Sequence, residues 1–282
     1  MKALITFGCS WTHGIGSWVD NNLPDIEPER YKKITKEAQA SVNPALGISF
    51  STPGAEWTKG MGGMYQYSYR SLLTERKDCV NINFGEGGSS NTKQFRRAEE
   101  YFNTDQYKKY DEVIVLWGLT STARIELWFP EKNRYKTFFL SNNINLKKRP
   151  KDLIRKILLE DHYNHDEEVN RLSIQMQHWD DYFKMKGIRN YWYDTFNHHN
   201  YEYKSPNMIM GDKNPRDLMS NLCIEQGMKL QKDGYHYSFW APDNDRIKFL
   251  IKKRLVNPLS VHPNKQGSLL LADILDKYVN FC

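Results

Sequence analysis

Ser10, in the stretch FGCSWTHG, is the first residue of the chain whose type and place could do chemistry. The short apolar run 3–7 ends at Gly8, which predicts a strand that enters a tight loop. In a parallel α/β sheet, ligands and catalytic groups collect in the loops beyond the carboxyl ends of the strands. A serine at this point is therefore a candidate nucleophile, and its alternative role is to cap the following helix.

His262, in the stretch VHPNKQG near the other end of the sequence, could be the base that such a serine needs. Two loops between them are rich in small residues, GGSSN at 87–91 and GLTSTAR at 118–124. Tight glycine loops present backbone amides that can hold the oxyanion of an acyl-transfer intermediate. If the fold brings these four segments to one edge, they predict acyl transfer by an activated serine.

The elements that must position these segments alternate along the chain. Apolar runs predict strands at 3–7, 79–85, 111–118 and 188–196. Periodicity and capping residues predict helices at 61–77, from Ser90 or Asn91 onward, at 166–186 with Gly187 as C-cap, and after His262. This alternation predicts a mostly parallel sheet with helices on both faces and the strand at 3–7 in the centre. Three insertions are expected in this single domain of residues 1–282, at about 17–60, 128–165 and 198–245.

Composition restricts the class of protein. The 282 residues are 39% hydrophobic and 26% charged, which is typical of a globular chain, and the formal net charge is +6. No nucleic-acid motif accompanies that charge, so no nucleic-acid partner is expected. We find neither a signal peptide nor an apolar run of about 20 residues, and expect no membrane contact and a cytoplasmic location. Four widely spaced cysteines predict free thiols: Cys9, Cys79, Cys223 and Cys282.

Three further features have two interpretations each. His162 and His165 stand beside carboxylates at a spacing that a metal could use, but we favour a solvated helix start and expect no metal. Arg124 and Glu126 predict either a surface ion pair or the lining of a pocket. The aromatic residues of WFPEKNRYKTFF, 128–139, are either core or a surface on which sugar rings could stack.

The motifs together resemble the SGNH (GDSL-like) hydrolase superfamily, in its divergent phage-encoded form. FGCSWTHG is similar to the first block of that family, which implies Ser10 as the nucleophile. NFGEGGSSN is similar to the second block, which implies that the Gly88 amide lines the oxyanion hole. VIVLWGLTSTAR occupies the third block, and VHPNKQG the fifth, which implies His262 as the base. The resemblance implies a flavodoxin-like three-layer sandwich with a five-stranded parallel sheet.

The sequence departs from the family pattern at two positions. Thr120 stands where the third block has an asparagine that donates to the oxyanion, and its hydroxyl can also donate. Leu259 stands where the fifth block has the aspartate that orients the histidine. Groups that could orient His262 instead are a backbone carbonyl, Asn257, Asp243 and Asp245.

The resemblance implies a serine esterase that acts on a small carboxylic ester or an acetylated carbohydrate, for example a glycan O-acetyl group, without a cofactor. The alternative is a catalytically impaired protein of the same fold that binds glycans or builds a phage particle. Phage origin implies the host cytoplasm or the virion as its location, and the sequence predicts no oligomeric state. Beyond the catalytic and oxyanion residues, the pocket candidates are Ser90, Asn91, Ser121, Arg124 and Glu126.

Overall fold

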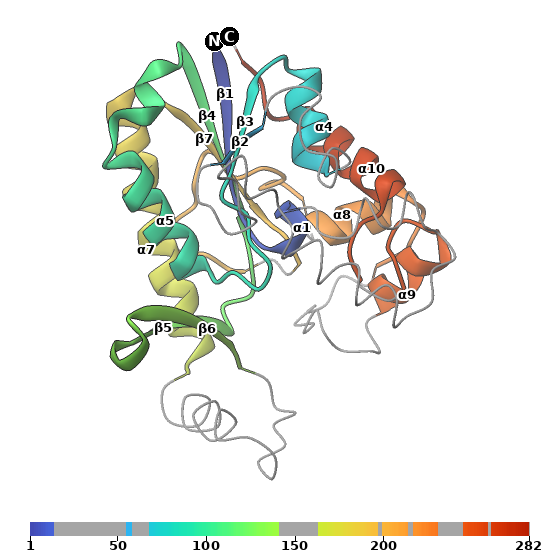
Figure 1. Ribbon diagram of the computed structural model, residues 1–282. Helices are drawn as coiled ribbons and strands as arrows, with labels where there is room; N and C mark the ends of the chain where they lie inside the picture. Colours follow the sequence, from blue (N-terminus) through green and yellow to red (C-terminus); the bar gives the residue numbers. More distant parts are fainter. Residues whose placement is uncertain are drawn as a thin grey trace.

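The computed structural model describes most of the chain (Figure 1). The described ranges are residues 1–13, 55–57, 68–140, 163–196, 199–213, 217–230, 245–258 and 261–281. Their elements form three layers, a central sheet with helices on both sides (Figure 1). The predicted flavodoxin-like three-layer architecture is confirmed.

The sheet has five strands in the order β2-β3-β1-β4-β7. Its parallel strands are β1 (Lys2–Phe7), β3 (Val80–Asn83), β4 (Glu112–Leu119) and β7 (Arg189–Asp194). The edge strand β2 (Ala55–Trp57) pairs antiparallel with β3, so the prediction of five parallel strands is wrong by one. With three residues, β2 is too short to leave a periodic pattern in the sequence, and short edge strands are a usual way to end a sheet.

The strand β1 lies in the centre of the sheet, as predicted. Ile5 of β1 is in register with Ile82 of β3 and Val115 of β4. Seven consecutive residues of β4 are buried, as expected for a strand with helices on both faces. Because these strands are parallel, the loops that follow β1, β3 and β4 meet at one edge of the sheet, which we call the carboxyl edge.

Helices cover both faces of the sheet (Figure 1). One face packs against α5 (Asn91–Phe102), the 3-10 helix η2 (Asp105–Lys109) and α7 (His165–Lys186). The other packs against α4 (Tyr69–Arg76), α8 (Leu218–Glu225), α9 (Asp245–Lys252) and α10 (Lys265–Asp276). No helix within the described ranges has both the length and the apolar character needed to cross a membrane.

The helix ends follow the capping chemistry of the sequence. The Ser90 hydroxyl accepts a hydrogen bond from the Lys93 amide and caps α5, and Gly187 ends α7 with φ +67°. Both predictions are confirmed. The helix predicted at 61–77 is α4, which starts at Tyr69, and residues 61–67 lie outside the described ranges.

Besides β2, further regular elements occupy parts of the segments that were expected to be irregular insertions. The helix α8 lies within 198–245. The strands β5 (Arg124–Phe129) and β6 (Arg134–Phe139) form an antiparallel hairpin that reaches into 128–165, and η3 (Pro130–Lys132) connects them. Each helix or strand has at most eight residues, which is too few for periodicity to separate it from a loop.

Candidate active site

Ser10 is the first residue of α1 (Ser10–His13), directly beyond β1. The backbone turns sharply at Gly8, where an added Cβ would overlap the Thr12 side chain. Only a glycine fits there, which explains the break that the sequence shows. The side chains of Ser10 and His13 lie outside the described part of the structure.

The turn that carries His262 is tied to α1. Trp11 Nε1 donates a hydrogen bond of 3.1 Å to the carbonyl oxygen of Val261. The neighbours of Ser10 and His262 in the sequence are therefore in direct contact across 250 positions. Val261 has φ +58°, a strained conformation for a β-branched residue, and such strain is found mainly at functional sites.

Backbone hydrogen bonds hold the half-buried His262 in place. The Asn257 amide donates to the carbonyl of His262 at 2.9 Å, and the Val261 amide donates to the carbonyl of Asn257 at 2.9 Å. Of the groups predicted to orient His262, Asn257 therefore acts on it through the backbone. Asp245 is exposed at the start of α9, and Asp243 and Leu259 lie outside the described ranges.

The loop after β3 packs on the loop after β1. The Glu86 amide donates to the carbonyl of Gly8 at 3.1 Å, and the Ser89 amide donates to the carbonyl of Glu86 at 3.1 Å. Gly88 completes this turn with φ +74° and is exposed. A side chain at Gly88 would meet no neighbour within 4 Å, so its positive φ, and not lack of space, favours glycine.

Asn91 joins the loops that follow β3 and β4. Its side-chain oxygen accepts from the Thr120 amide at 2.8 Å, and its amide group donates to the Thr120 carbonyl at 2.9 Å. This pair of bonds fixes the backbone of Thr120 in the way that a neighbouring strand would. The Thr120 hydroxyl is buried and has no hydrogen-bond partner within the described ranges.

The remaining predicted residues lie close by. Ser121 accepts a hydrogen bond from the Ala123 amide at 3.2 Å and stabilises the turn into β5. Arg124 is buried, with Nη1 at 3.4 Å from the carbonyl of Ser89. Burial lowers the pKa of the Arg124 guanidinium, and the neighbouring Cys9 thiol acts in the opposite direction.

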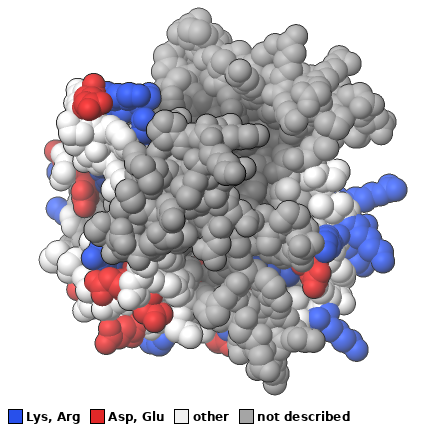
Figure 2. Space-filling model, turned by 90° about the horizontal axis from the view of Figure 1, so that it is seen from below, with Lys and Arg blue, Asp and Glu red and all other residues white. Residues whose placement is uncertain are grey.

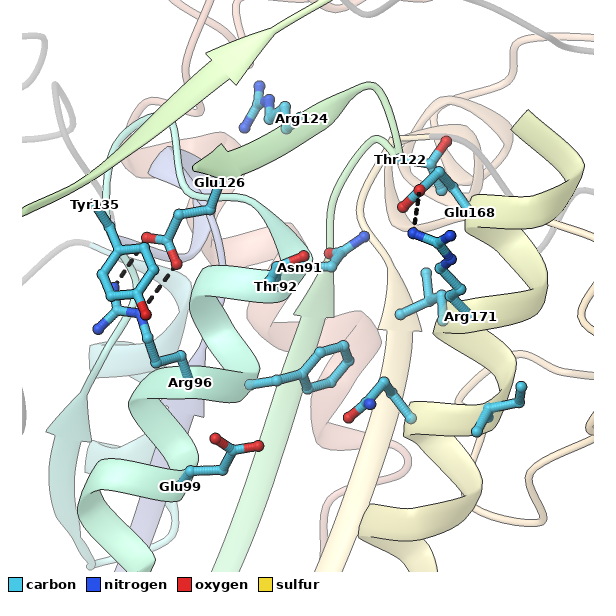
Figure 3. Close-up of a pocket in the computed structure, with 14 residues that line it drawn as sticks. Asn91, Thr92, Arg96, Glu99, Thr122, Arg124, Glu126, Tyr135, Glu168 and Arg171 are labelled. Carbon is cyan, nitrogen blue, oxygen red and sulfur yellow. Dashed lines mark hydrogen bonds and ion pairs between the residues drawn. The ribbon is translucent and has the colours of Figure 1, made fainter. Parts of the chain in front are cut away.

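Glu126 pairs with Arg96 of α5 and not with Arg124. Arg96 Nε and Nη2 donate to the two carboxylate oxygens at 3.0 and 2.9 Å, a bidentate geometry. The surface ion pair between Arg124 and Glu126, one of the two interpretations, is therefore not formed. Both residues line a pocket of about 490 Å³ between α5, α7 and the β5–β6 hairpin (Figure 3).

A cluster of three hydroxyls below α1 was not predicted. Tyr69 donates to Thr12 Oγ1 at 2.8 Å, Thr12 Oγ1 lies 3.2 Å from the Tyr193 hydroxyl, and the two phenols are 2.5 Å apart. Arg70 Nε also donates to the carbonyl of Thr12 at 3.0 Å. Burial raises the pKa of both phenols, so they stay neutral and fix the turn that carries Ser10. Nothing local in the sequence signals this cluster, because its members come from three distant elements.

No group of three or more metal-ligating side chains occurs in the ranges that the structure describes. His165 Nδ1 lies 3.1 Å from Thr122 Oγ1 and 3.3 Å from the Tyr163 hydroxyl, and His162 is outside those ranges. Cys9, Cys79 and Cys223 are free thiols, as predicted, and Cys282 is not described.

Comparison with solved structures gives distant similarities. Neither a protein-family model nor a curated protein matches the chain. A structure of a G-D-S-L family protein from Desulfitobacterium hafniense aligns with a TM-score of 0.39 and 10% identity, covering 98% of this chain and 99% of that one. A member of the lipolytic G-D-S-L family from Veillonella parvula aligns with a TM-score of 0.35 and 12% identity, covering 98% and 97%. Both belong to the family that the motifs resemble, and at this distance the function has to be argued from the residues of the chain itself.

Proposed function

We propose that this chain is a serine hydrolase of the GDSL type that cleaves a carboxylic ester, with Ser10 as nucleophile and His262 as base. The observation that supports the proposal is the hydrogen bond between Trp11 and Val261, because it joins the sequence neighbours of the two candidate residues across 250 positions. Nucleophile and base must come within hydrogen-bond reach for acyl transfer.

In this mechanism the Ser10 hydroxyl oxygen attacks the acyl carbon while His262 takes the hydroxyl proton. The tetrahedral intermediate collapses when His262 gives that proton to the leaving alcohol oxygen. Water then attacks the acyl-enzyme with His262 again as base, and the acid is released as Ser10 regains its proton. The chain's own side chains complete this cycle.

The oxyanion would be held by the amides of Ser10 and Gly88 and by the Thr120 hydroxyl. Two contacts support this assignment: the 86–89 turn is bonded to Gly8, and Asn91 fixes the backbone of Thr120. A buried hydroxyl without an acceptor, as at Thr120, needs an explanation, and an oxyanion that forms only during the reaction is one. We expect Thr120→Val to lower kcat about 100-fold, the usual cost of one oxyanion donor.

The finer parts of the proposal follow from the motif resemblance. They are an O-acetyl group on a glycan as the ester, and the host cytoplasm or the virion of a phage as the place of action.

Labelling with a fluorophosphonate tests the proposal, because only an activated serine reacts with it. We expect one label per chain, on the peptide that contains Ser10, and turnover of p-nitrophenyl acetate. Both should disappear in Ser10→Ala and persist in Ser71→Ala, whose serine lies on α4 and bonds to Ser68 and Asn81. Absence of label and turnover in the intact chain would refute the enzyme and favour the non-catalytic alternative.

A further inference from the structure

Figure 3 shows the pocket between α5, α7 and the β5–β6 hairpin. Its volume of about 490 Å³ lies within the usual range of small-ligand sites. Asn91, Thr122 and Arg124 line it, and they belong to the loops and hairpin that follow β3 and β4. Arg124 also reaches the carbonyl of Ser89, the residue after Gly88. The end of the pocket at Arg124 is therefore one hydrogen bond away from the turn that carries Gly88.

Most of the charges that line the pocket are paired. Its charged lining residues are Arg96, Arg124, Arg171, Glu99, Glu126 and Glu168. The Arg124 guanidinium points away from the pocket, toward the Ser89 carbonyl and the Phe196 ring. Arg96 is neutralised by Glu126, and Arg171 Nη1 lies 3.3 Å from Glu168 Oε1; these two pairs stand on opposite sides of the pocket (Figure 3). Acidic and basic side chains are also mixed on the α5 and α7 side of the surface seen from the carboxyl edge (Figure 2). Nothing in this arrangement attracts a ligand with a net charge.

Two aromatic rings extend the pocket along the hairpin. Trp128 and Tyr135 pair directly across β5 and β6, with ring centroids 4.8 Å apart. Their exposed fractions are 45% and 44%, large values for such side chains. The Arg96 guanidinium lies 4.3 Å from the centroid of the Tyr135 ring and, since Glu126 holds that guanidinium, keeps the ring in place. The hairpin thus presents a fixed aromatic surface to solvent.

We propose that the pocket and this aromatic pair bind a neutral oligosaccharide that carries the ester cleaved at Ser10. Sugar rings have apolar C–H faces that stack on aromatic rings, and hydroxyls that bond to carboxylates and guanidinium groups held in fixed positions. A lipid chain would bury the ionised lining without hydrogen bonds, which is unfavourable. An anionic ligand would meet Glu99, Glu126 and Glu168 beside Arg96 and Arg171. The role of the sugar as carrier of the ester rests on the proposed function, but its binding does not.

Calorimetric titration of the Ser10→Ala chain with cellohexaose, maltohexaose, chitohexaose and mannohexaose tests the binding site. We expect at least one of these neutral hexasaccharides to bind with one-to-one stoichiometry, and its affinity to be the same at low and high salt. Tyr135→Ala should weaken that binding about tenfold, and Trp128→Ala should weaken it as well, because each removes a stacking ring. Tyr135→Phe, which keeps the ring, should bind like the parent.

The matched control is Ile224→Ala, which changes a similarly exposed apolar side chain on α8, outside the pocket. Its affinity should equal that of the parent. The proposal is wrong if none of the four sugars binds, if a heparin hexasaccharide binds in their place, or if Tyr135→Ala binds as tightly as the parent. These results are independent of fluorophosphonate labelling, so a failure of the binding site and a failure of the esterase assignment can be told apart.

Discussion

The two faces of the sheet each bury an aspartate, and they stabilise it differently. On the α5 and α7 face, all the hydrogen bonds that Asp180 accepts within the described ranges come from neutral groups, at 2.5 to 3.2 Å. The donors are Asn190, Trp192, Tyr203, Ser205 and Asn207. On the other face, Asp217 caps α8 and accepts from Arg246 Nη1 at 3.0 Å, with both side chains buried. One carboxylate is stabilised by dipoles and the other by an opposite charge.

The contacts of the two aspartates indicate which face of the sheet supports the candidate site. Arg246 also donates to the carbonyl of Phe196 at 2.8 Å, and the Phe196 ring lies edge-on to Trp11 at 5.3 Å. A change at Asp217 can thus reach Trp11, the residue next to Ser10, through three contacts, by way of Arg246 and Phe196. The donors to Asp180 instead tie α7 to β7 and to residues 203–207. We therefore expect changes on the Asp217 face to affect both stability and Ser10 reactivity, and changes at Asp180 to affect stability alone.

Asp217→Ala should have the largest effect. It leaves the Arg246 charge buried without its carboxylate, and breaking one side of a buried ion pair costs about 3–5 kcal/mol. Urea unfolding measures the loss, and fluorophosphonate labelling of the folded fraction should also slow. The double variant Asp217→Ala/Arg246→Leu should recover part of the stability because the lone charge is gone. A loss below about 1 kcal/mol would show that the ion pair is not buried as described.

Asp180→Asn should cost somewhat less, about 2–3 kcal/mol, because an amide NH₂ group would face donors where an oxygen now accepts. Asp181→Asn is the matched control: its side chain is exposed on the same helix, and its effect should stay within about 0.5 kcal/mol. The rate of Ser10 labelling per folded molecule should be unchanged in both variants. A slowing as large as that of Asp217→Ala would remove the distinction between the two faces.

Gly118→Ala should destabilise the chain by about 1–3 kcal/mol through overpacking. A Cβ at Gly118 would overlap the Tyr193 hydroxyl and lie 2.8 Å from Thr12 Oγ1, within the hydroxyl cluster. The double variant Gly118→Ala/Tyr193→Phe should recover part of the loss, since the phenol oxygen is then absent. Full tolerance of the alanine, measured by thermal unfolding, would contradict the close packing below α1.

Tyr193→Phe should have the smallest effect at neutral pH, about 1 kcal/mol for the lost hydrogen bonds. Because burial raises the pKa of Tyr193 in the folded chain, its phenol keeps its proton after the unfolded chain begins to lose it near pH 10. Stability from this group is complete below pH 10 and falls above it, by about 1.4 kcal/mol per pH unit. Urea unfolding between pH 8 and 11 should therefore show a smaller alkaline loss in the variant. Parallel curves for both proteins would be the contrary result.

Much of the fold can be predicted from the sequence, because long buried helices and strands produce long apolar runs or periodic patterns of apolar residues. The apolar run of β4, the period of α7 and the αL glycine after it place these elements to within a few residues. The antiparallel β2, the β5–β6 hairpin and α8 were missed, since each is short and its pattern is set by its neighbours in space.

Some features of the candidate site could likewise be predicted from the sequence, and others could not. Ser10 and His262 could be named because they stand at strand and helix ends that a parallel sheet brings to one edge, and Gly88 because NFGEGGSSN is similar to a block of the family. Three other features could not be predicted from the sequence. They are the hydrogen bonds between Asn91 and the Thr120 backbone, the hydroxyl cluster around Thr12 and the ion pair between Arg96 and Glu126. Each joins side chains whose distance depends on how helices pack, which no local pattern encodes.

The hydrogen bond between Trp11 and Val261 also orders events during synthesis. Trp11 leaves the ribosome 250 residues before Val261, its partner in this bond. The central strand must therefore wait for β3, β4 and finally the last helix before the site can close, and such distant contacts slow folding. A ribosome-bound chain that has not yet emerged past Val261 should carry Ser10 without reacting with a fluorophosphonate, so that reactivity would report the arrival of the segment around Val261.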